Sequence, residues 1–380
     1  SYKDKYLLTA AVRKDGSSKF GENNRWGTFP SIALGWDIIQ EPWMKNRPTA
    51  LSGLKLRASY GLAGNDEIAN FGYLSSLVSG NYVLGGSLAG GRVVTSISNQ
   101  DLAWEKTGEY NIGLDLGLFD DRIRLTADVY KSKTQSLVLS VQIPPSSGFT
   151  STTENIGAVQ NKGFEFTINS ANIVSHNFTW TSNVNFSLNR NKALALGPNQ
   201  TFIQAGTSME GHPTNITQIG QPVGMFFGYK VLGLYQSADD VAKNPHFADA
   251  IPGNLKVMDA NGDGTISPVS DFTVIGNPYP KFNYAITSSM SYKQFDLNFV
   301  MAGSYGADML DASMASYHNI DGIFNVLSDM TKRWRSASDP GDGKHPTTAG
   351  PSLGRVMYRD VNSLNVFSAS YLWCKNISLQ

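Results

Sequence analysis

Apolar and polar residues alternate along much of this chain of 380 residues. In residues 123–130, Ile, Leu, Ala and Val occupy every second position, and Arg, Thr, Asp and Tyr fill the positions between them. Successive side chains of a β-strand point to opposite faces, so the pattern predicts strands with one apolar and one polar face. The same alternation recurs in residues 54–62, 109–118, 164–169, 177–189, 282–292 and 295–303.

The length of these segments favours strands that cross a membrane. Several alternate for ten or more residues, whereas ordinary strands most often have about five or six. A tilted strand needs about 9–11 residues to cross a bilayer. The pattern therefore predicts an all-β fold, an antiparallel transmembrane β-barrel with long extracellular loops. Short connectors at 119–122, 172–176 and 293–294 alternate with long Gly/Asn/Pro-rich stretches at 64–100, 191–224 and 304–345.

A large soluble β-sandwich or propeller is the structural alternative, because its strands also alternate. That alternative predicts shorter strands, more uniform connectors and a repeat period, and the sequence shows no repeat. Aromatic residues near the ends of the predicted strands also favour the barrel, in which aromatic girdles mark the membrane surfaces. They are Trp26, Phe29, Trp36, Trp43, Trp104, Tyr110, Trp180, Tyr292 and Phe295.

Composition narrows the function classes. The chain carries 31 basic and 31 acidic residues, and this zero net charge argues against nucleic acid as a partner. Cys374 is the single cysteine, so no disulfide framework is expected. The five histidines show no metal-binding spacing such as HExxH, and no nucleophile elbow or phosphate-binding loop is present, so we expect no enzymatic activity. The histidines are His176, His212, His246, His318 and His345.

Residues 259–271 (DANGDGTISPVSD) contain the first half of a calcium-binding loop. Asp259, Asn261 and Asp263 stand at alternate positions, as in the EF-hand loop. Gly264 permits the sharp turn, and Thr265 follows with a carbonyl oxygen as a further ligand.

The second half of the loop departs from the EF-hand. Ser270 stands where the closing carboxylate belongs, and Asp271 follows one residue later. The flanking segments 255–257 and 272–276 read as extended, so the helix pair of a calcium sensor is not expected. Two interpretations stay open: a bound structural Ca²⁺, held by Asp259, Asn261, Asp263, Thr265 and Asp271, or an Asx-turn loop that holds itself together without metal.

Several blocks together resemble the C-terminal barrel half of SusC/RagA-like TonB-dependent transporters, in the order of that family. They are 27-GTFPSIALGWDI, 42-PWMKN, 54-LKLRASYGLAGN, 104-WEKTGEYNIGLDLGLFDDRIRLTADVYKSKT, 155-NIGAVQNKGFEFTIN, 275-IGNPYPKFNYAITSSMSYKQFDLNFVMAGSYG and 371-YLWCKNISL. The resemblance implies an outer-membrane barrel of about 22 strands that surrounds an N-terminal plug. It also implies a SusD-like surface lipoprotein over the mouth and import driven by TonB. Oligosaccharides, and sometimes peptides, are the implied substrates.

The pattern predicts roughly twelve or thirteen strands, fewer than the family's barrel. We therefore expect residues 1–380 to be the C-terminal portion of such a barrel, with the plug, the TonB box, the signal sequence and the last strands outside this sequence. Residues 191–280 are expected to form a long extracellular loop region that includes the calcium-type loop. A further amphipathic helix is predicted over residues 321–334, where apolar residues recur at helical spacing.

The predicted function is outer-membrane import, with the SusD-like lipoprotein, the TonB complex and membrane lipid as partners. The alternative from another class is a non-transporting surface or adhesion protein whose β-rich fold carries calcium-stapled loops. Aromatic rings in the external loops are candidates for stacking on sugar rings, although loop packing is the commoner role of such residues. These candidates are Tyr73, Tyr82, Phe226, Phe227, Tyr229 and Tyr305.

Overall fold

The computed structural model describes residues 1–143, 145–149, 151–198, 200–319, 325–348 and 352–380. Two compact units make up the chain. The first, which we call the strand unit, comprises Ser1–Thr201, Asn283–Ala302 and Trp373–Gln380. The second, the loop unit, comprises Phe202–Phe282 and Gly303–Leu372. Among the described residues, every helix is too short or too polar to span a membrane.

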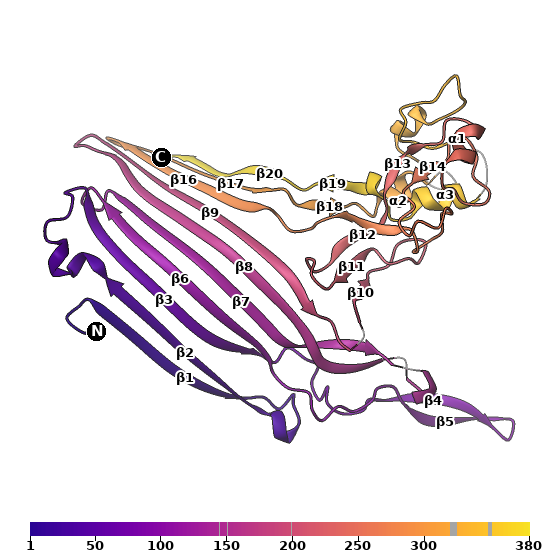
Figure 1. Cartoon of the computed structure of the whole chain (residues 1–380), viewed down its shortest axis with the longest axis horizontal. Coiled ribbons are helices and arrows are strands. Elements are labelled where there is room, and N and C mark those ends of the chain that lie inside the picture. Colours follow the sequence, from indigo (N-terminus) through magenta and orange to yellow (C-terminus); the bar gives the residue numbers. More distant parts are fainter. Residues whose placement is uncertain (144, 150, 199, 320–324, 349–351) are drawn as a thin grey trace. The chain divides into compact units, whose positions relative to one another are not determined.

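The strand unit is built on one ten-stranded sheet, in the order β1-β2-β3-β6-β7-β8-β9-β16-β17-β20 (Figure 1). Neighbouring strands follow one another along the chain, with β1 and β20 at the two edges of the sheet. The strands are β1 (Tyr6–Gly16), β2 (Trp26–Asp37), β3 (Leu51–Asn65), β6 (Glu105–Leu118), β7 (Ile123–Gln142), β8 (Ser151–Val174), β9 (Phe178–Ala195), β16 (Phe282–Tyr292), β17 (Phe295–Tyr305) and β20 (Tyr371–Leu379).

The register of the sheet confirms the two-faced strands. Ala58, Ile112, Val129, Phe164 and Leu188 stand opposite one another on five successive strands and form one apolar row. Ile112 is 61% exposed and Val129 is 58% exposed, so this apolar face is open to its surroundings. It is the face expected to contact lipid.

Residues adjacent in sequence to those of the apolar row form a polar row on the opposite face of the sheet. That row consists of Arg57, Gly113, Asp128, Glu165, Ser187 and Asn283. Several charged and amide side chains on this face are one another's partners. The Arg57 guanidinium lies 2.9 Å from Asp115 and 3.0 Å from Asp128, and so joins β3, β6 and β7. Asn183 donates a hydrogen bond of 2.7 Å to Asn169.

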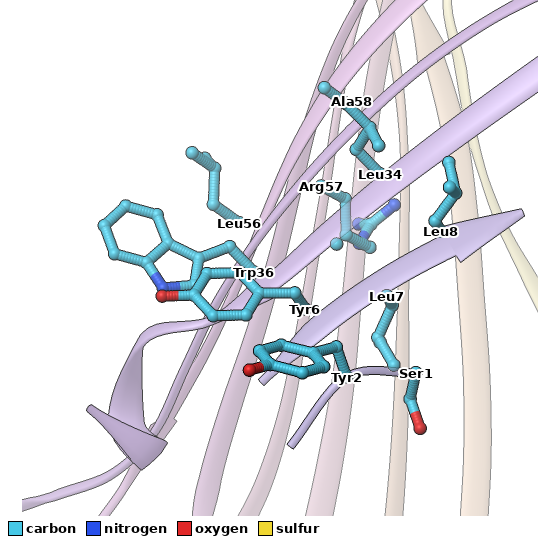
Figure 2. A pocket seen from close by; sticks show the side chains of 11 residues that line it. Ser1, Tyr2, Tyr6, Leu7, Leu8, Leu34, Trp36, Leu56, Arg57 and Ala58 are labelled. Carbon is cyan, nitrogen blue, oxygen red and sulfur yellow. The ribbon is translucent and has the colours of Figure 1, made fainter. Parts of the chain in front are cut away.

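An open apolar groove of about 720 Å³ lies on the apolar face at β1, β2 and β3 (Figure 2). Tyr6 stands opposite Trp36, and Leu8 stands opposite Leu34. The Tyr6 hydroxyl and the Trp36 indole N–H both donate to Glu41, at 2.6 and 3.1 Å. This combination of an apolar ring with a polar, hydrogen-bonded tip is typical of an aromatic girdle. We therefore assign the groove to lipid contact and not to a cargo site.

Strands β7 and β8 are longer than their neighbours and continue alone as a ribbon, which we define as residues 137–142 and 151–157. Pairing with β6 ends at Gln135, and pairing with β9 begins at Ala158. The Asn155 side chain fixes the base of the ribbon. It donates to the carbonyls of Ala103 and Ser136, each at 2.8 Å, and accepts from the Ala103 N–H at 2.9 Å.

The predicted loop 64–100 is partly a hairpin. Strands β4 (Leu77–Leu84) and β5 (Ser87–Val94) pair along their whole length. Gly85 and Gly86 form the turn, both with positive φ, which glycine adopts without the strain of a side chain. At the same end of the strand unit, Phe20, Phe29, Leu102 and Trp104 form a small buried cluster.

The loop unit is made of short elements around its own core. Its sheets are β10-β11-β12-β15, β13-β14 and β18-β19. The strands are β10 (Phe202–Ala205), β11 (Asn215–Gln218), β12 (Met225–Tyr229), β13 (Val231–Leu234), β14 (Leu255–Val257), β15 (Phe272–Gly276), β18 (Asp308–Leu310) and β19 (Val366–Ser368). The helices are α1 (Ala238–Lys243), α2 (Met314–Tyr317) and α3 (Ser352–Arg359). The 3-10 turns among the described residues are η1 (Glu22–Asn24), η2 (Ile38–Gln40), η3 (Pro42–Met44), η4 (Pro145–Ser147), η5 (Ser328–Lys332) and η6 (Ser363–Asn365).

The amphipathic helix predicted over residues 321–334 is wrong in the part that the structure describes. Residues 320–324 lie outside the described residues. Leu327 is extended, with φ −64° and ψ 151°, and only the 3-10 turn η5 follows it. An extended residue at this position interrupts the helical hydrogen bonds that the apolar spacing had suggested.

The assignment of the two faces predicts how a charge in the middle of β6 affects the stability of the barrel. Replacing the apolar-face residue Ile112 by Arg should destabilise the membrane-inserted barrel by about 2–4 kcal/mol, because a charge would face hydrocarbon. The matched variant Asn111→Arg places the same charge on the polar face and should cost much less. Urea unfolding of the complete protein in lipid vesicles measures both. Equal losses in the two variants would contradict the assignment of the faces.

Candidate functional site

The calcium-type loop lies in the loop unit, between β14 and β15. Both carboxylate oxygens of Asp259 accept backbone hydrogen bonds, from Gly262 at 2.7 Å and from Gly264 at 2.9 Å. Both glycines have positive φ, 78° and 85°, which lets their N–H groups turn back toward Asp259. The Asn261 side-chain oxygen accepts from the Asp263 N–H at 2.9 Å. The first half of the loop is thus wound around the predicted ligand residues.

Asp263 is held by Thr265 and Asn261. Its Oδ1 accepts from the backbone N–H and from the hydroxyl of Thr265, each at 2.8 Å, and its Oδ2 accepts from the Asn261 amide at 2.9 Å. The Thr265 backbone bond, followed by the Thr265 hydroxyl and Asn261, holds the pKa of Asp263 below its usual value. Asp263 therefore stays ionised, as a cation ligand must be.

Asp271 closes the loop from the buried side. It is fully buried, and its two oxygens accept from the Ala260 N–H at 3.0 Å and the Ser267 N–H at 2.7 Å. Val269, two residues before Asp271, has a φ of 66°, a strained conformation for a β-branched residue. The loop is also tied to the preceding segment, because the Ile266 N–H donates to the His246 carbonyl at 3.1 Å. Hydrogen bonds to backbone groups leave no pattern in the sequence, so the sequence could not predict these contacts.

The loop offers oxygen donors only, which suits a hard cation such as Ca²⁺. A carboxylate oxygen has two lone pairs, so accepting one N–H still leaves room for a metal bond. Among the described residues, the three aspartates do not bring three ligand oxygens within 4.8 Å of one another, so a cation would have to draw them closer. The same hydrogen bonds would hold an Asx-turn loop without metal. Both interpretations of Asp259, Asn261, Asp263, Thr265 and Asp271 stay open on this geometry.

Two of the aromatic candidates for substrate contact lie in the core of the loop unit. Phe227 and Tyr229 are buried, with ring centroids 5.5 and 4.6 Å from that of Phe272. Burial, followed by the charges of Asp360 and Asp271, raises the pKa of Tyr229. Rings packed in this way serve the core and offer no free face to a sugar.

The remaining aromatic candidates are more accessible. Tyr82 on β4 and Tyr305 at the end of β17 are about half exposed. Tyr305 stacks on Phe282 with a centroid distance of 5.2 Å, so one of its faces is already covered. Tyr73 is half-buried against the Phe20 cluster, and Phe226 is half-buried within β12. Of the six candidates, Tyr82 is the most exposed.

A family model for the TonB-dependent receptor-like β-barrel matches residues 1–317. The chain belongs to the TonB-dependent receptor β-barrel family. This membership confirms the predicted fold class and the outer-membrane location, and it agrees with the expectation that the chain is not an enzyme.

Individual relatives extend over the whole chain. TonB-dependent receptor P3 of Formosa agariphila is 34% identical over 383 residues, which cover 99% of this chain and 37% of the relative. TonB-dependent receptor SusC of Bacteroides thetaiotaomicron is 33% identical over 387 residues, covering 99% of this chain and 36% of SusC. The chain thus spans less than two fifths of the length of these receptors.

Solved structures support the same fold. The RagAB peptide importer in its open-open state matches with a TM-score of 0.82 and 23% identity, over 100% of this chain and 39% of the importer chain. A further RagAB peptide transporter structure matches with a TM-score of 0.80 and 24% identity, over 99% of this chain and 39% of that chain. The predicted resemblance to SusC/RagA-like receptors is therefore confirmed.

The buried carboxylate of Asp271 yields a prediction for the order of the loop at residues 259–271. Asp271→Ala would leave the Ala260 and Ser267 N–H groups without acceptors, at a cost of about 1–3 kcal/mol each where they remain buried. Amide hydrogen exchange across residues 259–271 should become faster in the complete protein. Asp249→Ala, which changes an exposed aspartate of the same unit, is the matched control. Unchanged exchange in Asp271→Ala would show that Asp271 does not hold the loop.

Proposed function

We propose that this chain forms the barrel wall and loops of an outer-membrane importer of oligosaccharides or peptides. The observation that carries the proposal is the similarity to TonB-dependent receptors along 99% of the chain. The name of the family supports TonB as the source of energy. RagAB is a peptide transporter, and the similarity to it supports peptides as one substrate class to test.

The polar face of the sheet supports passage of a hydrated cargo. Its asparagine and threonine side chains form neutral hydrogen-bonded ladders, such as Thr167 to Asn185 at 2.9 Å and Asn189 to Asn161 at 3.0 Å. Three of its charges are paired in the Arg57 cluster with Asp115 and Asp128. Such a wall can exchange hydrogen bonds with hydroxyl or peptide groups and has no large excess of either charge.

We further propose that a SusD-like surface lipoprotein covers the extracellular mouth and captures the cargo. The resemblance to SusC and RagA supports this partner. Tyr82 and Tyr305 are our candidates for ring contact with cargo or lipoprotein, because large exposed aromatic side chains are typical of binding surfaces. The elements that carry them, β4 and the end of β17, adjoin the long connections of the strands.

Uptake by living cells tests the import function. Deletion of the gene should abolish accumulation of at least one labelled oligosaccharide or peptide, and complementation with the complete gene should restore it. Removal of TonB should cause the same loss, because import needs its energy. Normal accumulation of every tested oligosaccharide and peptide, together with lost attachment to surfaces, would favour the adhesion alternative.

We also propose that residues 259–271 bind one structural Ca²⁺. Asp259, Asn261, Asp263 and Asp271 would supply side-chain oxygens, and Thr265 would supply its carbonyl oxygen. The all-oxygen donor set and the ionised Asp263 support this proposal. The ion would fasten the loop and take no part in transport chemistry.

Calcium titration of the complete protein tests this site. Wild type should bind one Ca²⁺ at the loop, with oxygen ligands about 2.3–2.6 Å from the ion. Asp263→Ala should lose that ion and speed hydrogen exchange in the loop, without loss of membrane insertion, whereas Asp249→Ala should bind as wild type does. Equal calcium binding by Asp263→Ala and wild type would refute the site and leave the metal-free Asx-turn loop.

A further inference from the structure

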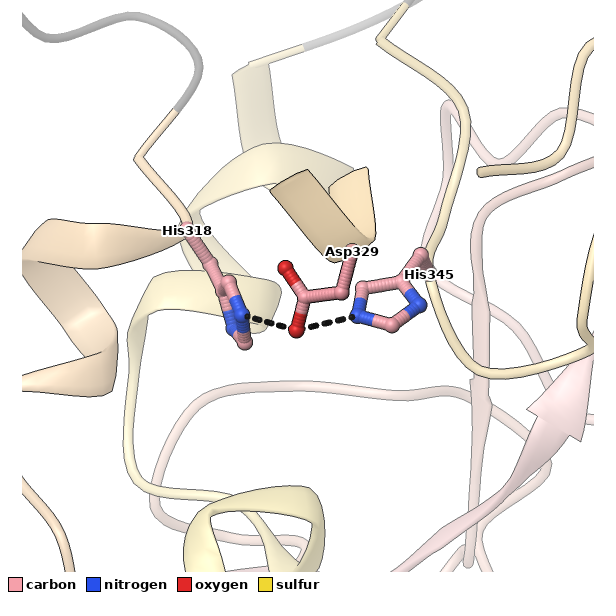
Figure 3. A group of neighbouring side chains, drawn as sticks. All are labelled: His318, Asp329 and His345. Carbon is pink, nitrogen blue, oxygen red and sulfur yellow. Dashed lines mark hydrogen bonds and ion pairs between the residues drawn. The ribbon is translucent and has the colours of Figure 1, made fainter. Parts of the chain in front are cut away.

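Three segments of the loop unit bring two histidines and an aspartate together (Figure 3). His318 directly follows α2, Asp329 lies in η5, and His345 lies in the segment that leads toward α3. All three come after residue 317, where the match to the family model ends. Their separation along the chain gives no metal-binding motif, so only the fold reveals the cluster.

The distances between these side chains suit a small metal ion. The Nε2 atom of His318 lies 3.1 Å from Oδ2 of Asp329, and the Nε2 atom of His345 lies 3.4 Å from the same oxygen. One ligand atom from each residue falls within 4.8 Å of the others. Zinc bonds of about 2.0–2.1 Å in a tetrahedral site separate neighbouring ligand atoms by about 3.3 Å. The cluster therefore needs little rearrangement to surround such an ion.

The hydrogen-bond partners of His345 also point to a cation at this place. The Nδ1 atom of His345 lies 2.7 Å from Oδ2 of Asp342, which is close enough for an N–H donor. A neutral imidazole has one N–H, so donation to Asp342 leaves Nε2 as a bare lone pair. That lone pair faces the Asp329 carboxylate, another acceptor. A metal ion between them would be bound by both, and a carboxylate behind the histidine is the usual support of a metal ligand.

Burial and packing hold the cluster in place. The histidine side chains are 12% and 11% exposed, and the Asp329 side chain is 38% exposed, which leaves a path for entry. Among the described residues, Oδ1 of Asp329 is buried and has no hydrogen-bond partner. The His318 ring stacks on Tyr358 at 5.6 Å, which fixes its orientation.

We propose that His318, Asp329 and His345 form a binding site for Zn²⁺. His318 and His345 would bind through Nε2, Asp329 would bind through its carboxylate, and a water molecule would fill the fourth position. Asp342 is a positioning residue, because it fixes the His345 ring through Nδ1 without touching the ion. The ion would join α2, η5 and the segment of His345 into one fastened group of loops.

Metal content of the complete protein in detergent, purified without a histidine tag, tests the proposal. After chelator treatment, titration with ZnSO₄ should restore one Zn²⁺ per chain at this site, and X-ray absorption should show two nitrogen ligands at about 2.0–2.1 Å. The double variant His318→Gln/His345→Gln should lose that ion. Asp342→Asn, which keeps all three ligands, should weaken binding about 10- to 100-fold. His176→Gln and His246→Gln, which change histidines outside the cluster, should bind as wild type does.

Two results would overturn the site. A wild-type protein that retains no Zn²⁺ would identify the cluster as an ion-paired network with a protonated His345. Equal Zn²⁺ retention by wild type and the double variant would place the ion elsewhere. Heat-modifiable migration of the barrel in gels checks that each variant is folded, and if the double variant does not fold, the absorption spectrum of wild type still decides the histidine ligands.

Discussion

Pairing of backbone N–H and C=O groups is the constraint on which the strand unit depends. Hydrocarbon offers no water to an unpaired peptide group, so each strand must satisfy its neighbour without gaps. Strands β6 and β7 do so from the pair Lys106 and Gln135 to the pair Leu118 and Ile123. A slip of one residue would turn Ile112 toward the polar face and Asn111 toward lipid. The β7–β8 pairing is irregular at Gln135/Leu137 and Leu137/Val138, where the ribbon begins, and the β8–β9 pairing is irregular at Ala158/Val159 and Ala171/Ile173.

The loop unit meets the same demand by a different means. Its strands are short, and buried polar side chains satisfy the backbone between them. Asp271 accepts from two N–H groups, and the fully buried Asn362 donates to the carbonyls of Tyr358 and Asp360 and accepts from the Leu364 N–H. Such fully satisfied polar groups specify one arrangement of irregular chain. The candidate ion sites would add to this network and not replace it.

This difference explains what the sequence could predict. Alternation along β6 and β9 is a local pattern, so strands, faces and short turns were predictable from neighbouring residues. The calcium-type spacing of Asp259, Asn261 and Asp263 was equally local, and the structure winds the loop around those residues. The meeting of His318 with His345 depends on how separate loops fold together, and no local spacing encodes it. Apolar spacing also misled in the 321–334 segment, where the extended Leu327 ends any helical pattern, and it could not tell the buried Tyr229 from an exposed ring.

The β7–β8 ribbon differs from the membrane-spanning part of the same strands in how freely its side chains can change. Strand β8 has 24 residues, which at about 3.3 Å each extend about 80 Å, while the apolar band of an outer-membrane barrel is about 25 Å tall. Residues 151–155 are polar on both faces, as expected for a strand segment that no longer meets lipid. There, backbone pairing and the hydrogen bonds of Asn155 remain the main demands, and the side chains of residues 151–154 can change without harm to insertion. New recognition properties can therefore evolve on the ribbon while the membrane-spanning part of the same strands stays as it is.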